Sequence, residues 1–313
     1  MKKKIICIVG ATASGKTKLG IELAKKINAE IISADSMQIY KNLDIGTAKV
    51  TKEEMAGIPH HMIDICDIKD KFSVADFKDM CYYEIDKIFQ KEKNVIIVGG
   101  TGLYFNAIVY DMQFKDEIVD NEYREELIEK LNKEGKESLY KELKKVDPKS
   151  ALNIHPNNTK RVIRALEIAK NSNLLKSEHM LSEKERLTFF SHPKYDFFVY
   201  FIDYPREELY KRINRRIDIM VKEGILDEAK MIYDMKLDKN NTCMQAIGYK
   251  EFFDYFEEKI SLDEAIDELK KATRHYAKRQ ITWFNNKLKC NHLKQYNNVN
   301  AMTEEIIQDS KIL

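Results

Sequence analysis

The segment Gly10–Thr17, with the sequence GATASGKT, constrains the fold of this chain more than any other feature. It fits the phosphate-binding pattern G-x-x-x-x-G-K-[ST]. A short apolar run from Lys4 to Val9 precedes it, and residues 18–27 behind it carry apolar side chains at helical spacing. Because a strand, a glycine-rich loop and a helix follow in this order, the pattern predicts an α/β fold with a phosphate loop.

The chemistry of such a loop rests on its backbone and on two side chains. Consecutive N–H groups and the helix N-terminus attract an anion, Lys16 adds a cation, and the Thr17 hydroxyl can reach a magnesium ion. The loop by itself does not distinguish an enzyme that uses a nucleoside triphosphate from one that releases diphosphate. We expect a diphosphate to be bound by Gly10, Ala11, Thr12, Ala13, Ser14, Gly15, Lys16 and Thr17.

Polar side chains follow two further apolar runs. Residues 31–34 lead into Asp35, and residues 95–98 lead into Gly99–Tyr104, which contains Thr101. Runs that end abruptly in this way are typical of buried parallel strands, whose carboxyl ends carry the ligand site in α/β proteins. Asp35 is therefore a candidate general base, with the alternative that Asp-Ser merely caps a turn.

The pattern of apolar residues divides the chain into a core and an insertion. Residues 197–204 read as another strand, followed by an amphipathic helix. Between the strands, residues 115–191 are rich in Glu, Lys and Leu and show only helical periodicity. We expect residues 1–114 and 192–313 to form a parallel sheet flanked by helices, with a helical C-terminal part, and residues 115–191 to form an all-helical insertion domain.

Composition excludes several other classes of protein. The chain is 43% hydrophobic and 33% charged, and its five cysteines lack the spacing of a zinc site or disulfide framework. The N-terminal apolar run is too short for a signal sequence or a membrane span, so we expect a cytoplasmic protein with no membrane association. Between Glu268 and Glu304 the only charged side chains are basic, which suits a phosphate backbone or a solvated helix face.

Motifs along almost the whole chain resemble the bacterial tRNA dimethylallyltransferases. The resemblance includes the phosphate loop, Ser33–Tyr40, Asp44–Lys49 and Val98–Tyr104. It continues with Pro59–His61, Phe72–Phe77, His155–Asn158, Arg164–Glu167, Gly248–Glu251 and Thr273–Phe284. The set of motifs in this order is far more specific than the phosphate loop alone.

The resemblance implies a reaction and a role for four side chains. In that family the loop holds dimethylallyl diphosphate, and the N6 amine of an adenine next to the tRNA anticodon, at position 37, displaces the diphosphate. Asp35 would accept the proton from the amine. Lys16, Thr101 and Arg216 would stabilise the departing diphosphate, with Mg²⁺ as the cofactor and Thr17 as its indirect protein contact.

The resemblance also implies a macromolecular partner. Because the adenine must reach a pocket, it would be flipped out of the anticodon loop, and the helical insertion would grip the anticodon stem-loop. We expect a monomeric enzyme. The residues implied in tRNA contact are Asp35, Ser36, Met37, Gln38, Thr101, Tyr123, Lys160, Arg161, Val162, Ile163, Arg164, Gln245, Gly248, Tyr249 and Lys250.

Two other activities use similar residues. An adenylate isopentenyltransferase would prenylate free AMP or ATP with the same loop and base, although the long insertion and the basic C-terminal block argue against it. A small-molecule kinase would bind ATP in the loop, with the insertion as its lid. A non-catalytic RNA-binding protein is disfavoured because Lys16, Thr17, Asp35 and Thr101 are all present.

Overall fold

The computed structural model describes residues 2–114, 121–171, 192–238 and 241–313. The chain divides into two compact units, one made of Met1–Asp111 with Ser191–Leu313 and the other of Met112–Phe190. The expected insertion boundaries at 115 and 191 fall on residues outside the described part.

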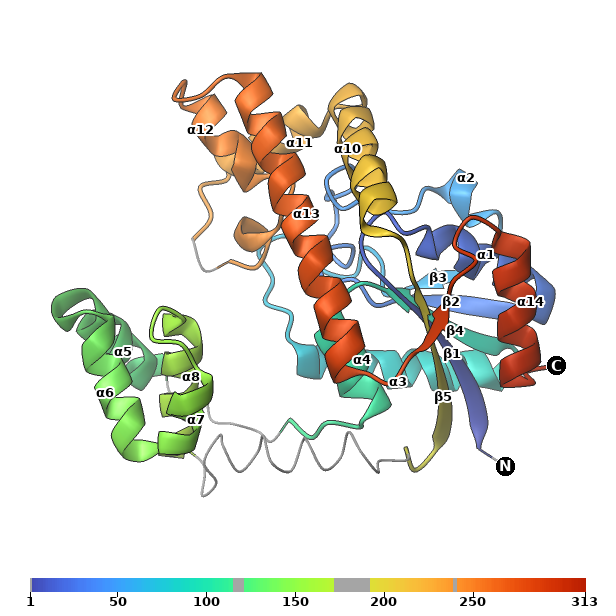
Figure 1. Ribbon diagram of the computed structural model, residues 1–313, viewed down its shortest axis with the longest axis horizontal. Helices are drawn as coiled ribbons and strands as arrows, with labels where there is room; N and C mark the ends of the chain where they lie inside the picture. The colour runs from blue at the N-terminus through green and yellow to red at the C-terminus, as the bar shows by residue number, and fades with distance from the viewer. Residues whose placement is uncertain (1, 115–120, 172–191, 239–240) are drawn as a thin grey trace. The chain divides into compact units, whose positions relative to one another are not determined.

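A six-stranded sheet with the order β3-β2-β4-β1-β5-β6 forms the centre of the first unit (Figure 1). Every neighbouring pair is parallel. This arrangement confirms the expected α/β fold. The strands are β1 (Lys3–Val9), β2 (Ala29–Ser33), β3 (His60–His61), β4 (Asn94–Gly99), β5 (Tyr195–Ile202) and β6 (Asn291–Leu293).

Helices cover both faces of this sheet, as the continuous apolar strands require. On one face α1 (Lys16–Ile27) and α14 (Val299–Ser310) pack on alternate strand residues such as Ile8 and Val98. On the other face the ring of Phe284, from α13 (Leu262–Lys287), lies 6.0 Å from the rings of Phe105 and Phe201. Also on that side, α3 (Val74–Gln90) packs against α4 (Gly102–Val109).

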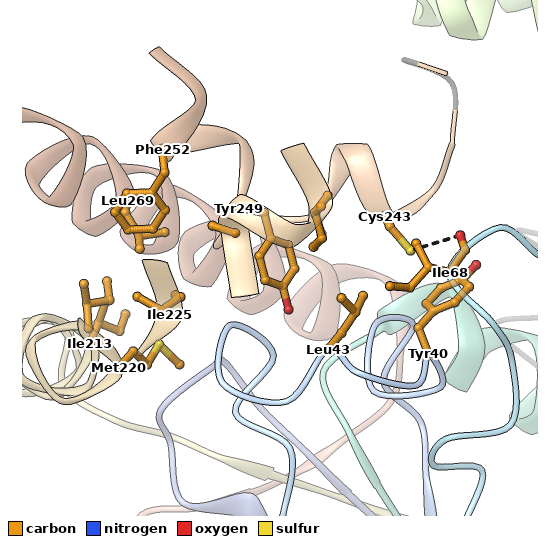
Figure 2. Packing of buried hydrophobic residues seen from close by; sticks show 14 of the residues in the cluster. Tyr40, Leu43, Ile68, Ile213, Met220, Ile225, Cys243, Tyr249, Phe252 and Leu269 are labelled. Atoms are coloured by element: carbon orange, nitrogen blue, oxygen red, sulfur yellow. Dashed lines mark hydrogen bonds between the residues drawn. The ribbon is translucent and has the colours of Figure 1, made fainter. Parts of the chain in front are cut away.

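A second apolar core lies beyond the carboxyl ends of the strands (Figure 2). Here α10 (Arg206–Glu223) and α11 (Ile225–Asp234) pack with α13 and with the loop that contains Tyr40 and Leu43. Gly224, with φ 99°, separates α10 from α11 and permits the sharp turn between them. The remaining short elements of this region are η1 (Cys243–Gln245), η2 (Lys250–Phe252) and α12 (Phe253–Phe256). The short helix α2 (Lys52–Met55) lies elsewhere, and its Met55 packs against the core formed by α1 and α14.

The described residues of the second unit are helical and have a core of their own. The helices are α5 (Asn121–Glu134), α6 (Lys136–Val146), α7 (Pro148–Asn153) and α8 (Thr159–Asn171). Leu139 and Leu143 from α6 pack with Val162 and Leu166 from α8. Asp147 starts α7 as its N-cap by accepting a hydrogen bond from the Ser150 N–H at 3.0 Å.

The second unit is inserted between α4 and β5, and one tyrosine contacts both flanking points. The Tyr82 hydroxyl on α3 lies 2.9 Å from the Ile108 carbonyl oxygen, to which it donates, and 3.3 Å from an Asp111 carboxylate oxygen. It also lies 3.0 Å from the His192 Nε2 atom. Tyr195, in the first position of β5, pairs with Lys3 at the amino end of β1. The chain therefore re-enters the first unit at the amino end of β5, away from the carboxyl ends of the strands.

The four strands predicted from apolar runs are confirmed, whereas β3 and β6 were not predicted. They contain only two and three residues, and the sequence shows no apolar run at either place. They are ordered by pairing with β2 and β5 rather than by their own composition. Among the helices of the described residues, none is long and apolar enough to cross a membrane.

A buried carboxylate joins β2 to β3 and to the turn before β4. Glu30 is 1% exposed and accepts hydrogen bonds from His61 at 2.7 Å and from Lys91 and Lys93 at 2.9 Å. Burial raises the pKa of Glu30, but the hydrogen bonds from Lys93, Lys91 and His61 outweigh it and lower the pKa to about 2. The charged form is thus favoured by folding.

We predict that Glu30→Gln lowers the free energy of unfolding by about 2 kcal/mol at neutral pH, because charged hydrogen bonds are lost. The folded pKa is depressed, so the contribution is present above the ordinary value of 4.5 and disappears as the pH falls towards about 2. Urea unfolding across this range measures the effect, with the exposed Glu92→Gln as control. A difference between wild type and Glu30→Gln that is independent of pH would contradict the prediction.

Candidate active site

The three adjacent strands β2, β4 and β1 carry the predicted site residues on the loops at their carboxyl ends. β1 leads into the phosphate loop, β2 into Asp35, and β4 into Gly99–Thr101. The loops are close because the N–H of Ala34 donates to the Val98 carbonyl at 2.8 Å. A Cβ atom on Gly99 would lie 2.2 Å from the Ala34 carbonyl oxygen, so only glycine permits this approach.

The phosphate loop has the concave backbone expected of an anion site. Ala13 and Gly15 have left-handed conformations, with φ 62° and 84°, and alternation of this kind turns successive N–H groups inwards. Helix α1 begins at Lys16, directly behind the loop. The Lys16 Nζ atom donates to the Ala11 carbonyl at 2.7 Å, which holds the ammonium group across the loop.

Two cations and one carboxylate control the electrostatics of the site. Burial lowers the pKa of Lys16 to about 8. The negative charge of Asp35 opposes this shift, and the positive charge of Arg216 adds to it. Burial also lowers the pKa of Arg216, and Asp35 again opposes it. The Arg216 guanidinium donates to two neutral oxygens, the Thr12 hydroxyl at 3.4 Å and the Ala48 carbonyl at 3.5 Å. Both cations therefore gain from an anion that enters the loop.

Helix α10 supplies the arginines that contact the loop. The Arg216 Nη1 atom donates to the Thr12 hydroxyl at 3.4 Å, and the Arg212 Nε atom donates to the Ala13 carbonyl at 2.8 Å. The two arginines lie one turn apart on the same helix face, as their spacing predicts. Arg212 holds the outside of the loop, whereas Arg216 lines the cavity.

A hydrogen-bonded turn fixes Asp35. One carboxylate oxygen accepts from the Met37 N–H at 2.9 Å, and the neighbouring Ser36 N–H donates to the Thr101 hydroxyl at 3.0 Å. The Thr101 hydroxyl in turn donates to the Ser36 hydroxyl at 3.3 Å. Thr101 thus supports the Asp35 turn and follows Gly99 and Gly100, which line the cavity. The expected contact of its hydroxyl with the diphosphate stays a prediction.

A cavity of about 550 Å³ joins the phosphate loop to Asp35. Thr12, Ala13, Lys16 and Thr17 line one part of it, and the apolar side chains of α10 and α13 line another. Such a mixture of a cationic end and an apolar wall suits an anion attached to a hydrocarbon group. The apolar lining includes Ile213, Ile217, Met220, Ala246, Ile247 and Leu269.

Most residues expected to meet tRNA separate into three groups. The first group lines the cavity and consists of Asp35, Ser36, Met37, Gln38, Gly248 and Lys250. The second lies in the insertion, where Lys160, Arg161 and Arg164 are exposed but Val162 and Ile163 are buried in its core. In that unit, Lys170 lies 3.8 Å from the ring centre of Tyr123. The side chain of Gln245 lies outside the described part of the chain.

Tyr249 alone forms the third group, because its side chain is buried. It is 1% exposed, and its hydroxyl donates to a Glu228 oxygen at 2.8 Å. The same carboxylate accepts from the N–H groups of Asp44, Ile45 and Gly46, each at 2.9 Å. The Tyr249 side chain therefore holds the loop that lines the cavity beside Gln38, and a tRNA contact at this position of the chain stays a prediction.

Sequence reasoning missed the contribution of α13 to the cavity. From the sequence, its basic block suits a phosphate backbone or a solvated helix face. In the structure Tyr276, Arg279 and Gln280 line the cavity, while Lys278 lies on the outside of the helix. The helical spacing of residues 273, 276 and 280 is the signal that would have found this face.

A parallel α/β sheet with a phosphate loop, a fixed carboxylate and a buried arginine around one cavity defines an enzyme that acts on a phosphorylated substrate. Residues 38–287 match the model of the IPP transferase family. The chain belongs to this family and is therefore a prenyltransferase.

Curated relatives agree with this family. The tRNA dimethylallyltransferase of Halalkalibacterium halodurans is 48% identical over 287 residues, which cover 92% of this chain and 90% of that protein. The protein of the same name from Bacillus velezensis is 47% identical over 287 residues, with 92% and 89% covered.

Solved structures show the same fold. A tRNA isopentenylpyrophosphate transferase from Bacillus halodurans has a TM-score of 0.71 at 43% identity and covers 99% of this chain and 97% of its own. A eukaryotic dimethylallyltransferase, described as acting on tRNA, has a TM-score of 0.82 at 30% identity. That match covers 99% of this chain and 79% of the eukaryotic chain.

The depressed pKa of Lys16 predicts a pH-dependent affinity for inorganic diphosphate. The ammonium is charged below about pH 8, so binding weakens as the pH rises through that value, by at most about tenfold per pH unit. Calorimetric titration between about pH 7 and about pH 9.5 measures it. The control is Lys16→Arg, whose charge persists across this range. Parallel curves for the two proteins would contradict the assignment, because they would reflect only the ligand's own ionisation.

Proposed function

We propose that this chain transfers the dimethylallyl group of dimethylallyl diphosphate to N6 of the adenosine next to the anticodon, position 37, in tRNA. The observation that carries the proposal is the joint cavity, because it unites a diphosphate cradle with the carboxylate of Asp35. The relatives named tRNA dimethylallyltransferase support the transfer of a dimethylallyl group to tRNA.

In the proposed reaction the N6 amine attacks the first carbon of the dimethylallyl group. The new C–N bond forms as the C–O bond to diphosphate breaks, and its electron pair goes to the bridging oxygen. The proton lost by N6 passes to the Asp35 carboxylate. The Met37 N–H orients this carboxylate by donating a hydrogen bond to its Oδ1 atom. Lys16 and Arg216 stabilise the charge that gathers on the diphosphate.

The donor set at the loop fits a magnesium ion that arrives with the diphosphate. The Thr17 hydroxyl lines the cavity next to Lys16, and the described residues contain no group of three His, Cys, Asp or Glu that could hold a metal. A Mg²⁺ that arrives with the diphosphate would keep phosphate oxygens and waters as its ligands, and Thr17 would be the residue of this loop that helps to hold it, indirectly. When bound, the ion supplies further neutralisation of the leaving group.

The tRNA is proposed to meet the chain at two places. The flipped adenosine would enter the cavity beside Asp35–Gln38 and Gly248–Lys250, where backbone and polar groups can read its edges. Exposed Lys160, Arg161 and Arg164 on α8 would contact the phosphates of the anticodon stem-loop. We further propose that the enzyme acts on cytoplasmic tRNA as a monomer.

The test is to incubate the protein with Mg²⁺, dimethylallyl diphosphate and unmodified tRNA, and to analyse the digested nucleosides by mass spectrometry. We expect a prenylated adenosine that requires the tRNA and the donor and increases with Mg²⁺. Parallel incubations contain AMP or ATP in place of tRNA. Prenylated AMP or ATP without modified tRNA would assign the chain to the adenylate isopentenyltransferases, and consumption of ATP alone would indicate a kinase.

Asp35→Asn is expected to reduce kcat by about 10²–10⁴ because the amide cannot accept the N6 proton. It can still accept the hydrogen bond from Met37, so the affinity for inorganic diphosphate should change little. Single-turnover prenylation and calorimetry separate these effects, with Asp196→Asn on an exposed position of β5 as control. Full kcat in Asp35→Asn would remove this carboxylate from the proton transfer.

A further inference from the structure

The side chain of Gln280 bridges two of the loops that build the site. It projects from α13, is 6% exposed, and lies among the residues that line the cavity. Its Oε1 atom accepts a hydrogen bond from the Thr12 N–H at 2.8 Å, and its Nε2 atom donates to the Gly100 carbonyl at 2.9 Å. We propose that Gln280 is a positioning residue that sets the spacing between the phosphate loop and the Asp35 turn; the inference rests on the proposed function.

The orientation of the amide is fixed by its partners. A backbone N–H can only donate and a backbone carbonyl can only accept, so Oε1 must face Thr12 and Nε2 must face Gly100. A Cβ atom on Gly100 would lie 2.3 Å from Nε2, so the close approach also requires a glycine on the loop. A carboxylate or a methyl group in place of the amide cannot make both contacts.

Each contact leads to a group with a part in the reaction. Thr12 carries the hydroxyl to which Arg216 donates. Gly100 precedes Thr101, whose hydroxyl accepts the Ser36 N–H beside Asp35. The amide therefore links the diphosphate end of the cavity to the proton-accepting end. The spacing of these ends must match the distance between the scissile C–O bond and the attacking amine.

The helix that holds Gln280 is itself firmly placed. Trp283, the only tryptophan in the chain, packs against Gly102 and donates its Nε1 hydrogen to the Asn106 side chain at 3.3 Å. Phe284 is fully buried between Phe105 and Phe201. Because α13 is anchored to α4 and β5, Gln280 can impose a position on the two loops rather than follow them.

The Thr12 N–H also becomes unavailable to the anion. In this structure that hydrogen bond belongs to Gln280, so the cradle is completed by the N–H groups further along the loop, around the left-handed Ala13 and Gly15. This assignment differs from a uniform ring of loop amides. It predicts that loss of the Gln280 amide disturbs alignment more than affinity.

Gln280→Met retains the length and volume of the side chain and removes both hydrogen bonds. We expect kcat for tRNA prenylation to fall about 10- to 100-fold, since misplacement of reacting groups by about 1 Å has effects of this size. The dissociation constant for inorganic diphosphate should change less than about threefold. Gln295→Met, at an exposed position outside the site, is the matched control and should behave as wild type.

A double-mutant cycle with Thr101→Val separates positioning from general destabilisation. If Gln280 acts through the Gly100–Thr101 loop, adding Gln280→Met to the Thr101→Val variant should lower kcat by less than about threefold. Gln280→Glu, which keeps the acceptor for Thr12 but loses donation to Gly100 and adds negative charge, should lose kcat and also bind diphosphate more weakly. These effects are measured on folded protein by single-turnover kinetics.

Two outcomes would overturn the inference. One is a wild-type kcat in Gln280→Met, and the other is a double variant whose loss of kcat equals the product of the losses in Gln280→Met and Thr101→Val. If the wild-type protein does not prenylate tRNA, the proposed function fails instead. In that case the fluorescence emission of Trp283, compared between wild type and Gln280→Met, tests the positioning role. A displaced Gly100–Gly102 loop must change the surroundings of the indole. An unchanged spectrum in Gln280→Met would then refute the positioning role.

Discussion

Parallel pairing of β2, β4 and β1 is the constraint on which the rest of the structure depends. The register that aligns Val9 with Gly99, and Ser33 with Val98, brings three loops from distant parts of the sequence to one edge. Loops after parallel strands all face the same way, so no additional element is needed to assemble them. The helices of the C-terminal part then cover this edge and close the cavity from the side opposite the sheet.

The charges in the cavity explain why the covering helices matter. Lys16 and Arg216 are both desolvated, and the Asp35 carboxylate attracts each of them. Two cations exposed to water would attract an anion weakly. The helices α10 and α13 exclude water from the cavity, so Lys16 and Arg216 attract an anion more strongly there. The apolar wall from α10 thus strengthens the binding of the anion as well as providing contacts for a hydrocarbon group.

The sequence predicted those parts of the molecule whose signals are local. Apolar runs located four strands, and the glycine pattern located the phosphate loop with Lys16 and Thr17. Residues whose roles depend on tertiary packing were less accessible. The family resemblance of its motif places Tyr249 among the tRNA contacts, whereas its burial against Gly46 becomes visible only in three dimensions. Gln280 stood within a basic helix and could not be distinguished from its neighbours until the face of α13 was known.

The contacts of Tyr82 at both ends of the insertion have an evolutionary consequence. The helical unit leaves and re-enters the core near a single tyrosine, next to the amino end of β5 rather than at the carboxyl-end loops. It also has a hydrophobic core of its own. Lengthening, shortening or exchanging this unit would therefore leave the geometry of the reacting groups intact. In such an architecture the inserted unit can diversify among descendants while the loops at the carboxyl ends of the strands are inherited unchanged.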